Sequence, residues 1–333
     1  MLFRSPIGPK AARLAQLIKK YPRTAFACLI DNPEAAIAMA KIFAAAGLTV
    51  PVYLDINVGM DRTGITPGDE ALNLYHLAAQ TPGITPVGLH AYDGHIRDTD
   101  LAERTRKCNE GFAKVEALRT AIETPAPQPA SATPAALKPA SAIPAAATPA
   151  SIAAPGAPLT IIAGGSPTFP IHANRAVDIQ CSPGTFVYWD KGYADSFPDQ
   201  PFQPAALVLT RVISQRDTRL TLDLGHKSIA PENDLSRRVF FLNGPNLKPI
   251  GQSEEHLVVE TPPGPQIIAA GPNHPQLIAA DPGPAHHIGD LFYGVPYHIC
   301  PTVALYDRAH IIESGRYTGT IWKNTARDRT ITI

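Results

Sequence analysis

The hydrophobic and polar positions of the first part of the chain alternate between two patterns. Three short apolar runs have the length and composition of buried β-strands, and they occupy residues 24–30, 50–58 and 86–92. Three segments with the period of an α-helix follow these runs, at residues 32–47, 68–80 and 99–122. Asn32 predicts the N-cap of the first helix, Pro33 its first turn and Gly47 its end. Strands and helices in this alternation predict parallel pairing with right-handed crossovers, as in a (β/α) barrel or an open doubly wound sheet.

Residues 124–158 interrupt the alternation of strands and helices. Nine of these 35 residues are proline, and the only charged residue is Lys138. Prolines recur every five positions from Pro129 to Pro149. Because this segment has no apolar periodicity and few backbone donors, it predicts an extended, disordered insertion in a loop of the α/β part.

The hydrophobic pattern of the chain changes at Pro204. The remaining chain consists of short β-type runs separated by turn residues, with almost no helical period. The predicted fold class is therefore α/β plus all-β. Residues 1–203 form a cofactor-binding α/β domain that contains the insertion, and residues 204–333 form an antiparallel β domain.

Composition narrows the function classes. The 333-residue chain has 29 Lys+Arg and 29 Asp+Glu, so no net charge favours nucleic acid or an anionic membrane as a partner. The apolar runs are shorter than a membrane span, and the N-terminal residues lack the apolar core of a signal peptide. The four cysteines are scattered without paired spacing, which predicts reduced thiols and a cytoplasmic protein.

Polar residues gather where the predicted strands end. Asp55 and Asn57 share one face at the end of the second strand, and Arg62 lies in the loop beyond. His90 and Tyr92 stand at the end of the third strand, followed directly by Asp93. Polar groups are costly to bury without partners, and α/β proteins bind ligands at this end of their strands, so these residues predict a site.

Two turns rich in small residues predict contacts with phosphate. The first contains Gly164, Gly165, Ser166 and Thr168 at a strand-to-helix junction, where glycines allow close approach and hydroxyls donate hydrogen bonds. The second, at the next strand, contains Gly184 and Thr185. Either turn alone is also compatible with a purely structural role.

His298 and Cys300 form the third candidate group. Two residues apart on a strand point to the same face, so imidazole and thiolate could bind one metal ion. The alternative is a pair of core residues.

Five segments together, "LDINVGMDRTGI", "GLHAYDGHI", "GGSPT", "SPGTFVYWD" and "HICPTVAL", occur in this order along the chain. In this order they resemble the D-threonine aldolase and D-serine dehydratase family. Members of this family are pyridoxal phosphate enzymes, so the resemblance implies that cofactor here. It also implies an alanine-racemase-like (β/α) barrel followed by a C-terminal antiparallel β domain. The resemblance covers nearly the whole chain outside the insertion. It implies a small D-hydroxy amino acid as substrate, and it is compatible with a homodimer.

The resemblance also implies residue roles. The glycine-rich turns would hold the phosphate of pyridoxal phosphate, Arg62 would lie near its phenolic oxygen, and Asp55 would supply a negative charge beside Arg62. His90 and Tyr92 would line the cofactor ring. His298 and Cys300 match the family's metal pair, with a cysteine as in the dehydratases. Zinc is favoured over manganese or magnesium because a thiolate is a soft ligand.

The implied reaction has two branches. Retro-aldol cleavage would give glycine and an aldehyde, as in the aldolases, and elimination would give a keto acid and ammonia, as in the dehydratases. The segment around His90 favours cleavage, and Cys300 favours elimination. The family's Schiff-base lysine stands in an N-terminal motif that this sequence does not contain. The barrel is therefore expected to be N-terminally incomplete. The chain is then an inactive fragment, a subunit completed by another piece, or a non-catalytic cofactor-binding protein.

Overall fold

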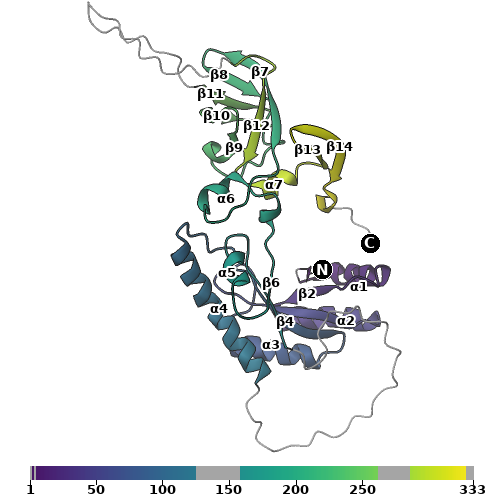
Figure 1. Ribbon diagram of the computed structural model, residues 1–333. Helices are drawn as coiled ribbons and strands as arrows, with labels where there is room; N and C mark the ends of the chain where they lie inside the picture. Colours follow the sequence, from purple (N-terminus) through teal and green to yellow (C-terminus); the bar gives the residue numbers. More distant parts are fainter. Residues whose placement is uncertain (1, 4, 125–157, 262–285, 328–333) are drawn as a thin grey trace, which may run out of the picture. The chain divides into compact units, whose positions relative to one another are not determined.

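The structure, a computed structural model, describes residues 2–3, 5–124, 158–261 and 286–327 (Figure 1). The chain divides into two compact units, Met1–Gly184 and Thr185–Thr332. The sequence analysis placed this division between residues 203 and 204, whereas residues 185–203 pack with the second unit. Apart from its two end residues, the proline- and alanine-rich insertion lies outside the described residues.

The first unit alternates strands and helices along its whole length (Figure 1). Its elements are β1 (Leu2–Phe3), α1 (Pro9–Lys20), β2 (Ala27–Ile30), α2 (Pro33–Ala45), β3 (Val50–Asp55), α3 (Asp69–Gln80), β4 (Ile84–Ala91), α4 (Leu101–Glu123), β5 (Thr160–Ala163), α5 (Phe169–Ala173) and β6 (Ile179–Cys181). The six strands form one parallel sheet in the order of the sequence. Sequential parallel order with intervening helices is the (β/α)-barrel arrangement, one of the two that the alternation allowed.

Local sequence signals explain where the helices begin. The Asn32 side chain accepts a hydrogen bond from the backbone N–H of Ala35 at 2.8 Å, and Pro33 occupies the first turn, as predicted. The longest helix, α4, begins in the same way, because the Asp100 carboxylate accepts from the N–H of Glu103 at 2.8 Å. Gly47 adopts a φ of 71° just after α2.

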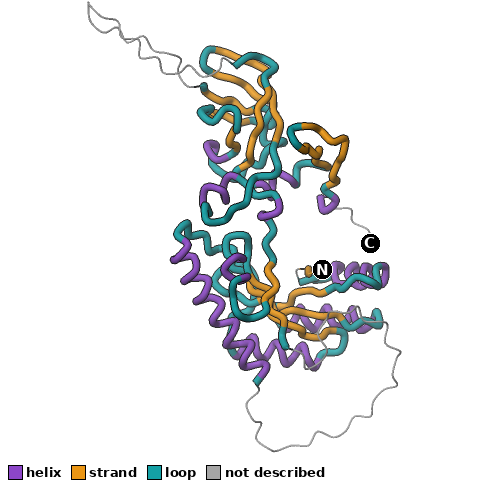
Figure 2. The backbone as a smooth tube through the Cα atoms, viewed as in Figure 1, coloured by secondary structure: helices purple, strands orange, loops and turns teal. Residues whose placement is uncertain are grey.

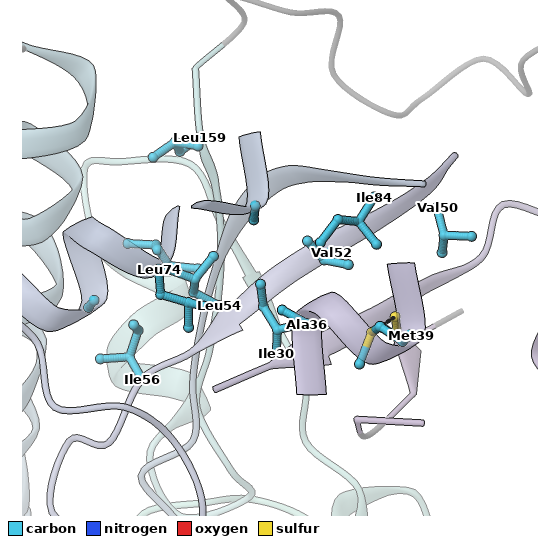
Figure 3. Packing of buried hydrophobic residues seen from close by; sticks show 14 of the residues in the cluster. Ile30, Ala36, Met39, Val50, Val52, Leu54, Ile56, Leu74, Ile84 and Leu159 are labelled. Carbon is cyan, nitrogen blue, oxygen red and sulfur yellow. Dashed lines mark hydrogen bonds between the residues drawn. The ribbon is translucent and has the colours of Figure 1, made fainter. Parts of the chain in front are cut away.

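The two faces of the parallel sheet differ in chemistry. The face toward the helices is apolar and is packed against α2 and α3, as Figure 3 shows for Ile30, Val52, Leu54 and Leu74. Alternation then turns the intervening residues of β3 and β4 to the inner face, where Tyr53, Asp55 and His90 lie. The side-chain period of two thus delivers polar groups to the inner face at the carboxyl ends of the strands.

The second unit consists mainly of strands (Figure 2), and their pairs are antiparallel. Its elements are η1 (Thr185–Val187), α6 (Lys191–Ser196), β7 (Val208–Arg216), β8 (Arg219–Leu222), η2 (Leu235–Arg237), β9 (Val239–Phe241), β10 (Lys248–Gln252), β11 (Leu257–Glu260), β12 (Leu291–Pro296), α7 (Ile299–Val303), β13 (Arg308–Glu313), β14 (Arg316–Lys323) and η3 (Thr325–Arg327). Six strands form a sheet in the order β10-β11-β8-β7-β12-β9, and β13 pairs with β14. A second apolar core, which includes Leu220, Phe241 and Phe292, supports the larger sheet.

Two further features bear on the expectations from sequence. None of the described helices combines the length and the apolar character that crossing a bilayer requires. All four cysteines are free thiols, as their irregular spacing predicted.

Candidate cofactor and metal sites

The polar residues at and after the carboxyl ends of β3 and β4 interact in pairs, and we call Asp55, Arg62, His90 and Tyr92 the strand-end group. Asp55 and His90 are paired in register across β3 and β4, and Asp55 Oδ1 lies 2.7 Å from His90 Nδ1. Both side chains are largely buried, which strengthens the pair. The Asp55 carboxylate pairs with His90, and its expected place beside Arg62 stays a prediction.

Arg62 contacts an aromatic ring. Its guanidinium carbon lies 4.9 Å from the centroid of the Tyr92 ring, a cation–π distance. Asn57 orders the loop that leads to Arg62, since its side-chain oxygen accepts from the N–H groups of Gly59 and Asp61 at 3.0 and 3.2 Å. The Asn57 amide also donates to the Asp61 carboxylate at 2.8 Å. Asn57 therefore holds the loop that leads to Arg62, and Arg62 lies against the ring of Tyr92, which directly follows β4.

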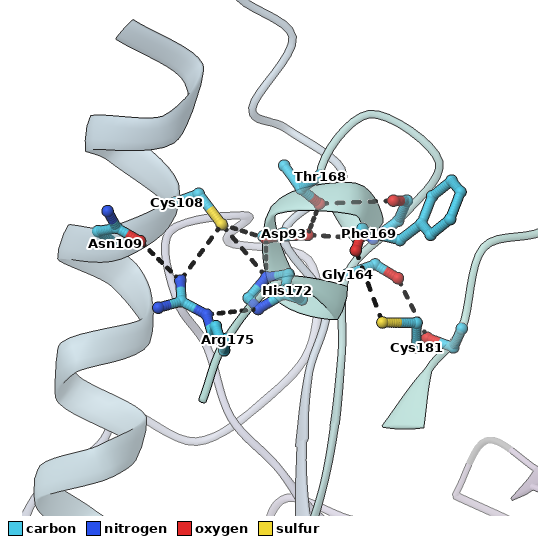
Figure 4. A network of polar contacts seen from close by, with 11 residues as sticks. Asp93, Cys108, Asn109, Gly164, Thr168, Phe169, His172, Arg175 and Cys181 are labelled. Carbon is cyan, nitrogen blue, oxygen red and sulfur yellow. Dashed lines mark hydrogen bonds and ion pairs between the residues drawn. The ribbon is translucent and has the colours of Figure 1, made fainter. Parts of the chain in front are cut away.

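The glycine-rich turn after β5 is held by a buried carboxylate (Figure 4). Asp93 Oδ1 accepts hydrogen bonds from the backbone N–H of Gly165 at 3.1 Å and from the Thr168 hydroxyl at 2.5 Å. Its other oxygen lies 2.8 Å from His172 Nε2. Burial alone would raise the pKa of Asp93, but the hydrogen bonds from His172, Thr168 and Gly165 outweigh burial and lower it.

The same network extends to the thiol of Cys108 on α4. Its sulfur lies 3.3 Å from His172 Nε2 and 3.6 Å from Asp93 Oδ2. Burial raises the pKa of Cys108 to about 12, and the Asp93 charge adds to this effect. A raised pKa favours the protonated thiol over the nucleophilic thiolate.

The ligand atoms of Asp93, Cys108 and His172 lie within 4.8 Å of one another, a spacing that one metal ion could bridge. The remote nitrogen of the imidazole argues against that. Arg175 Nε donates to His172 Nδ1 at 3.2 Å, so Nδ1 is an acceptor and the ring proton stays on Nε2. A metal-ligating histidine has the opposite arrangement, with its remote N–H donating to an acceptor. This buried group is a structural network that ties α4 and α5 to the end of β4.

The second small-residue turn spans the boundary between the two units, with Gly184 in the first unit and Thr185 in the second. Ser182 donates to the carbonyl of Gly164 at 3.3 Å, which joins it to the first turn. A Cβ at Gly184 would meet no atom within 4 Å, so that side of the turn is open. The hydroxyl of Thr185 lies 3.2 Å from the sulfur of Cys300, within the second unit.

His298 and Cys300 follow β12, and both are exposed. The strand placement predicted from the sequence is wrong, because β12 ends at Pro296, His298 is the N-cap residue of α7 and Cys300 lies in the first turn of that helix. His298 Nδ1 lies 2.7 Å from the carboxylate of Glu232. Hydrogen bonds to Cys300 and Glu232 raise the pKa of His298, and the His298 and Thr185 hydrogen bonds lower the pKa of Cys300. An exposed thiol with a lowered pKa beside an imidazole has the character of a metal ligand.

A buried carboxylate fixes the backbone of this pair. Asp190 Oδ2 accepts from the N–H of Ile299, between His298 and Cys300, at 3.1 Å, and its Oδ1 accepts from the N–H of Tyr193 at 2.8 Å. Asp190 is only 2% exposed. The sequence analysis missed both Asp190 and Glu232. The N-cap position of Asp190 before α6 was the one local signal, and it points to Tyr193, not to the metal pair.

The residues present fit the family's cofactor in part. Carboxylate, imidazole, cation and aromatic groups at the ends of β3 and β4 suit a polar heteroaromatic ring. The phosphate donors fit poorly, because Gly165 N–H and the Thr168 hydroxyl already bond Asp93, whose charge opposes an anion. The lysines of the described part of the first unit all lie on helices, at Lys10, Lys19, Lys20, Lys41, Lys107 and Lys114. None of them follows the end of a strand, where an imine to the cofactor would form.

A cavity of about 260 Å³ lies between the loops after β3 and β4 and the helix α4. Its lining consists of Val58, His95, Ile96, Asp98, Lys107, Glu110, Gly111 and Lys114. Lys107 bonds Asp98 at 2.6 Å, so part of its charge is neutralised internally. None of the predicted site residues lines the cavity, and the strand-end group remains the candidate site.

Comparison with known proteins assigns the two units to known families. Residues 5–156 match the family model "Alanine racemase, N-terminal domain", and residues 205–312 match "Putative serine dehydratase domain". The chain is 26% identical over 325 residues to a D-threonine aldolase from an Arthrobacter species, covering 96% of this chain and 72% of the relative. It is 23% identical over 334 residues to the 3-hydroxy-D-aspartate aldolase of Paracoccus denitrificans, covering 96% and 71%.

The fold has a counterpart among solved structures. The crystal structure of D-threonine aldolase from Filomicrobium marinum superposes with a TM-score of 0.74 at 22% identity, covering 96% of this chain and 74% of that one. The two family models follow one another along the chain as the α/β and β units do, and both aldolase relatives extend across them. The chain has the alanine-racemase-like fold and belongs to the D-threonine aldolase and D-serine dehydratase family.

Proposed function

We propose that this chain is a metal-dependent lyase of the pyridoxal phosphate type that cleaves D-β-hydroxy amino acids to glycine and an aldehyde. The pairing of His298 and Cys300, with Glu232 on the remote imidazole nitrogen, is the observation that supports it most. The pair lies within the segment that matches the serine dehydratase model. The names of both relatives, a D-threonine aldolase and a 3-hydroxy-D-aspartate aldolase, support cleavage of a D-configured substrate.

The metal is proposed to be bound by imidazole and thiolate, a donor set that suits zinc better than manganese or magnesium. When bound, such an ion would supply Lewis-acid polarisation of the substrate hydroxyl. Asp190 holds the backbone between the two ligands, and Thr185 donates to or accepts from the Cys300 sulfur. These contacts fix the geometry of the pair before an ion arrives.

The strand-end group of the first unit is proposed to face the cofactor ring. The Asp55–His90 pair offers a charge-assisted hydrogen bond, and Arg62 over Tyr92 offers a cation near an aromatic face. Gly184, with open space around it, is the described part of the small-residue turns that leaves room for the phosphate. Because Thr168 and Gly165 are turned onto Asp93, we assign no chemical step to the cofactor.

Specific observations favour two other functions. Elimination to a keto acid and ammonia is favoured by the cysteine in the metal pair and by the name of the family model that covers it. A binding protein without turnover is favoured by the positions of the described lysines of the first unit, which all lie on helices and not directly after a strand.

One experiment separates these functions. The purified chain is incubated with pyridoxal phosphate, zinc or manganese, and D-threonine, D-3-hydroxyaspartate or D-serine, and glycine, aldehyde and keto acid are measured. Glycine with aldehyde supports the proposal, and keto acid with ammonia supports elimination. Cys300→Ala should abolish either activity, and L-threonine should not react. Absence of turnover, together with no lysine labelled after borohydride reduction, would leave the binding protein and refute the lyase.

A further inference from the structure

The arrangement around His298 assigns a role to Glu232, a residue in the loop that follows β8. The Glu232 carboxylate lies 2.7 Å from His298 Nδ1. A carboxylate is an acceptor, so Nδ1 must donate, and the lone pair of the neutral imidazole is then on Nε2. Nε2 is therefore the ring nitrogen that Glu232 leaves free.

We propose that Glu232 is the positioning carboxylate of the metal site. It fixes the tautomer of His298 with Nε2 free to bind the ion, sets the orientation of the ring, and raises the basicity of the ligand nitrogen. Carboxylate partners of this kind typically contribute 10–100-fold to metal affinity. The inference rests on the proposed metal binding by His298 and Cys300 and adds a third residue to that site.

The surroundings of Glu232 favour this role over a stabilising surface pair. Both side chains are substantially exposed, at 46% for His298 and 39% for Glu232, and exposed pairs contribute little to stability. The nearest lysine in the sequence, Lys227, pairs with Glu254 and Glu255 and not with Glu232. Among the described residues, His298 is the charged or polar partner that Glu232 has.

The contrast with the buried network of the first unit strengthens the argument. His172 there accepts a hydrogen bond from Arg175 on Nδ1, which keeps the proton on Nε2. His298 donates to Glu232 from the same atom, which frees Nε2. Only the second arrangement leaves a nitrogen able to bind a cation.

The test is a cobalt titration of the metal-free full chain, because a cysteine thiolate bound to Co²⁺ gives a ligand-to-metal charge-transfer absorbance. Glu232→Gln keeps an acceptor but removes the charge, and Glu232→Leu removes both. We expect cobalt affinity to fall about 10-fold for Glu232→Gln and about 100-fold for Glu232→Leu. The charge-transfer band at saturation should persist in both variants. Glu254→Gln, which alters only the surface pair with Lys227, is the matched control and should bind cobalt as the wild type does.

The outcomes distinguish this inference from the proposed function. A wild-type chain without the band, or a Cys300→Ser variant that keeps it, would refute metal binding by the pair. A wild-type band combined with unchanged affinity in both Glu232 variants would refute the positioning role alone. Loss of the band at saturating cobalt in Glu232→Gln would also overturn it, since Cys300 would then fail to bind without that charge. The far-ultraviolet circular dichroism of each metal-free variant should match the wild type, which excludes misfolding as the cause.

Discussion

Replacement of Asp93 by asparagine should unfold the first unit far more easily than its small change in shape suggests. Asp93 is 4% exposed and accepts from Gly165, Thr168 and His172. Asparagine keeps one acceptor oxygen, which can serve Gly165 and Thr168. Its NH₂ group then faces the N–H of His172, donor against donor. The opposite rotation of the amide would bring the NH₂ against the N–H of Gly165.

The magnitude follows from the bonds that are lost. Hydrogen bonds to a charged group contribute about 1.5–3 kcal/mol, and buried donors left without an acceptor add their desolvation cost. We expect Asp93→Asn to lower the free energy of unfolding of the first unit by about 3 kcal/mol. For a domain of this size, that corresponds to a fall in Tm of about 6–12 °C.

A second substitution tests the tautomer of His172. Arg175→Met removes the donor on Nδ1 while keeping an unbranched side chain against Phe112, whose ring the guanidinium now covers at 4.1 Å. The proton of His172 can then move to Nδ1, so that Nε2 accepts from Asn at position 93. The double variant should be about 1–2 kcal/mol more stable than the two single effects predict when added.

The assay is urea unfolding followed by two probes. Far-ultraviolet circular dichroism reports the helices of the first unit, while both tryptophans, Trp189 and Trp322, lie in the second unit. The dichroism midpoint should fall in Asp93→Asn, and the fluorescence midpoint should stay where it is in the wild type. A loss below about 1 kcal/mol would refute the network's role. Strict additivity in the double variant would refute the assigned tautomer.

Three further predictions concern pH, thiol reactivity and backbone packing. Folding lowers the pKa of Asp93, so the stabilisation by its carboxylate is present above the unfolded pKa of about 3.9 and is lost as the pH falls below it. In urea titrations, the difference in free energy of unfolding between the wild type and Asp93→Asn should therefore stay constant above pH 5 and close below pH 4. Iodoacetamide at pH 8 should label Cys300 first, because it is exposed with a lowered pKa while the other thiols have raised values, and zinc should protect it; peptide mapping that finds a buried thiol labelled equally fast contradicts this. Gly88→Ala would place a Cβ 2.0 Å from the carbonyl oxygen of Thr160 and should cost about 3 kcal/mol, whereas Gly184→Ala, which meets open space, should change thermal stability by less than about 0.5 kcal/mol.

The elements of the first unit could be predicted because their signals are local. The apolar period, the cap at Asn32 and the stop at Gly47 act within a few residues, and the structure confirms the helix and both neighbouring strands there. Alternation along β3 also placed Asp55 on the inner face. These signals need no knowledge of which distant segment packs against them.

The partners of the site residues could not be predicted in the same way. Asp93 and His172 are 79 residues apart, with the insertion between them, and Glu232 and His298 are 66 residues apart. No periodicity or cap relates such positions, because their contact is created by the order of strands in each sheet. The glycine-rich turn shows the consequence. Its residue types predicted phosphate donors, while the fold supplies Asp93 as the acceptor for two of them.

Residue type alone would favour a different group from the one that we propose as the metal site of this chain. Asp93, Cys108 and His172 are buried, close together and of the ligand types that zinc prefers, whereas the His298–Cys300 pair is exposed and has fewer ligands. The hydrogen-bond partner of Nδ1 in each imidazole favours the other group, His298 and Cys300. Arg175 donates to His172 and forces a proton onto the nitrogen that would bind the ion, and Glu232 accepts from His298 and releases that nitrogen. The thiols agree, because burial raises the pKa of Cys108 to about 12 while the neighbours of Cys300 lower its pKa. We therefore expect metal binding to depend on the hydrogen-bond partners of the candidate ligands, and these partners differ between the two histidines.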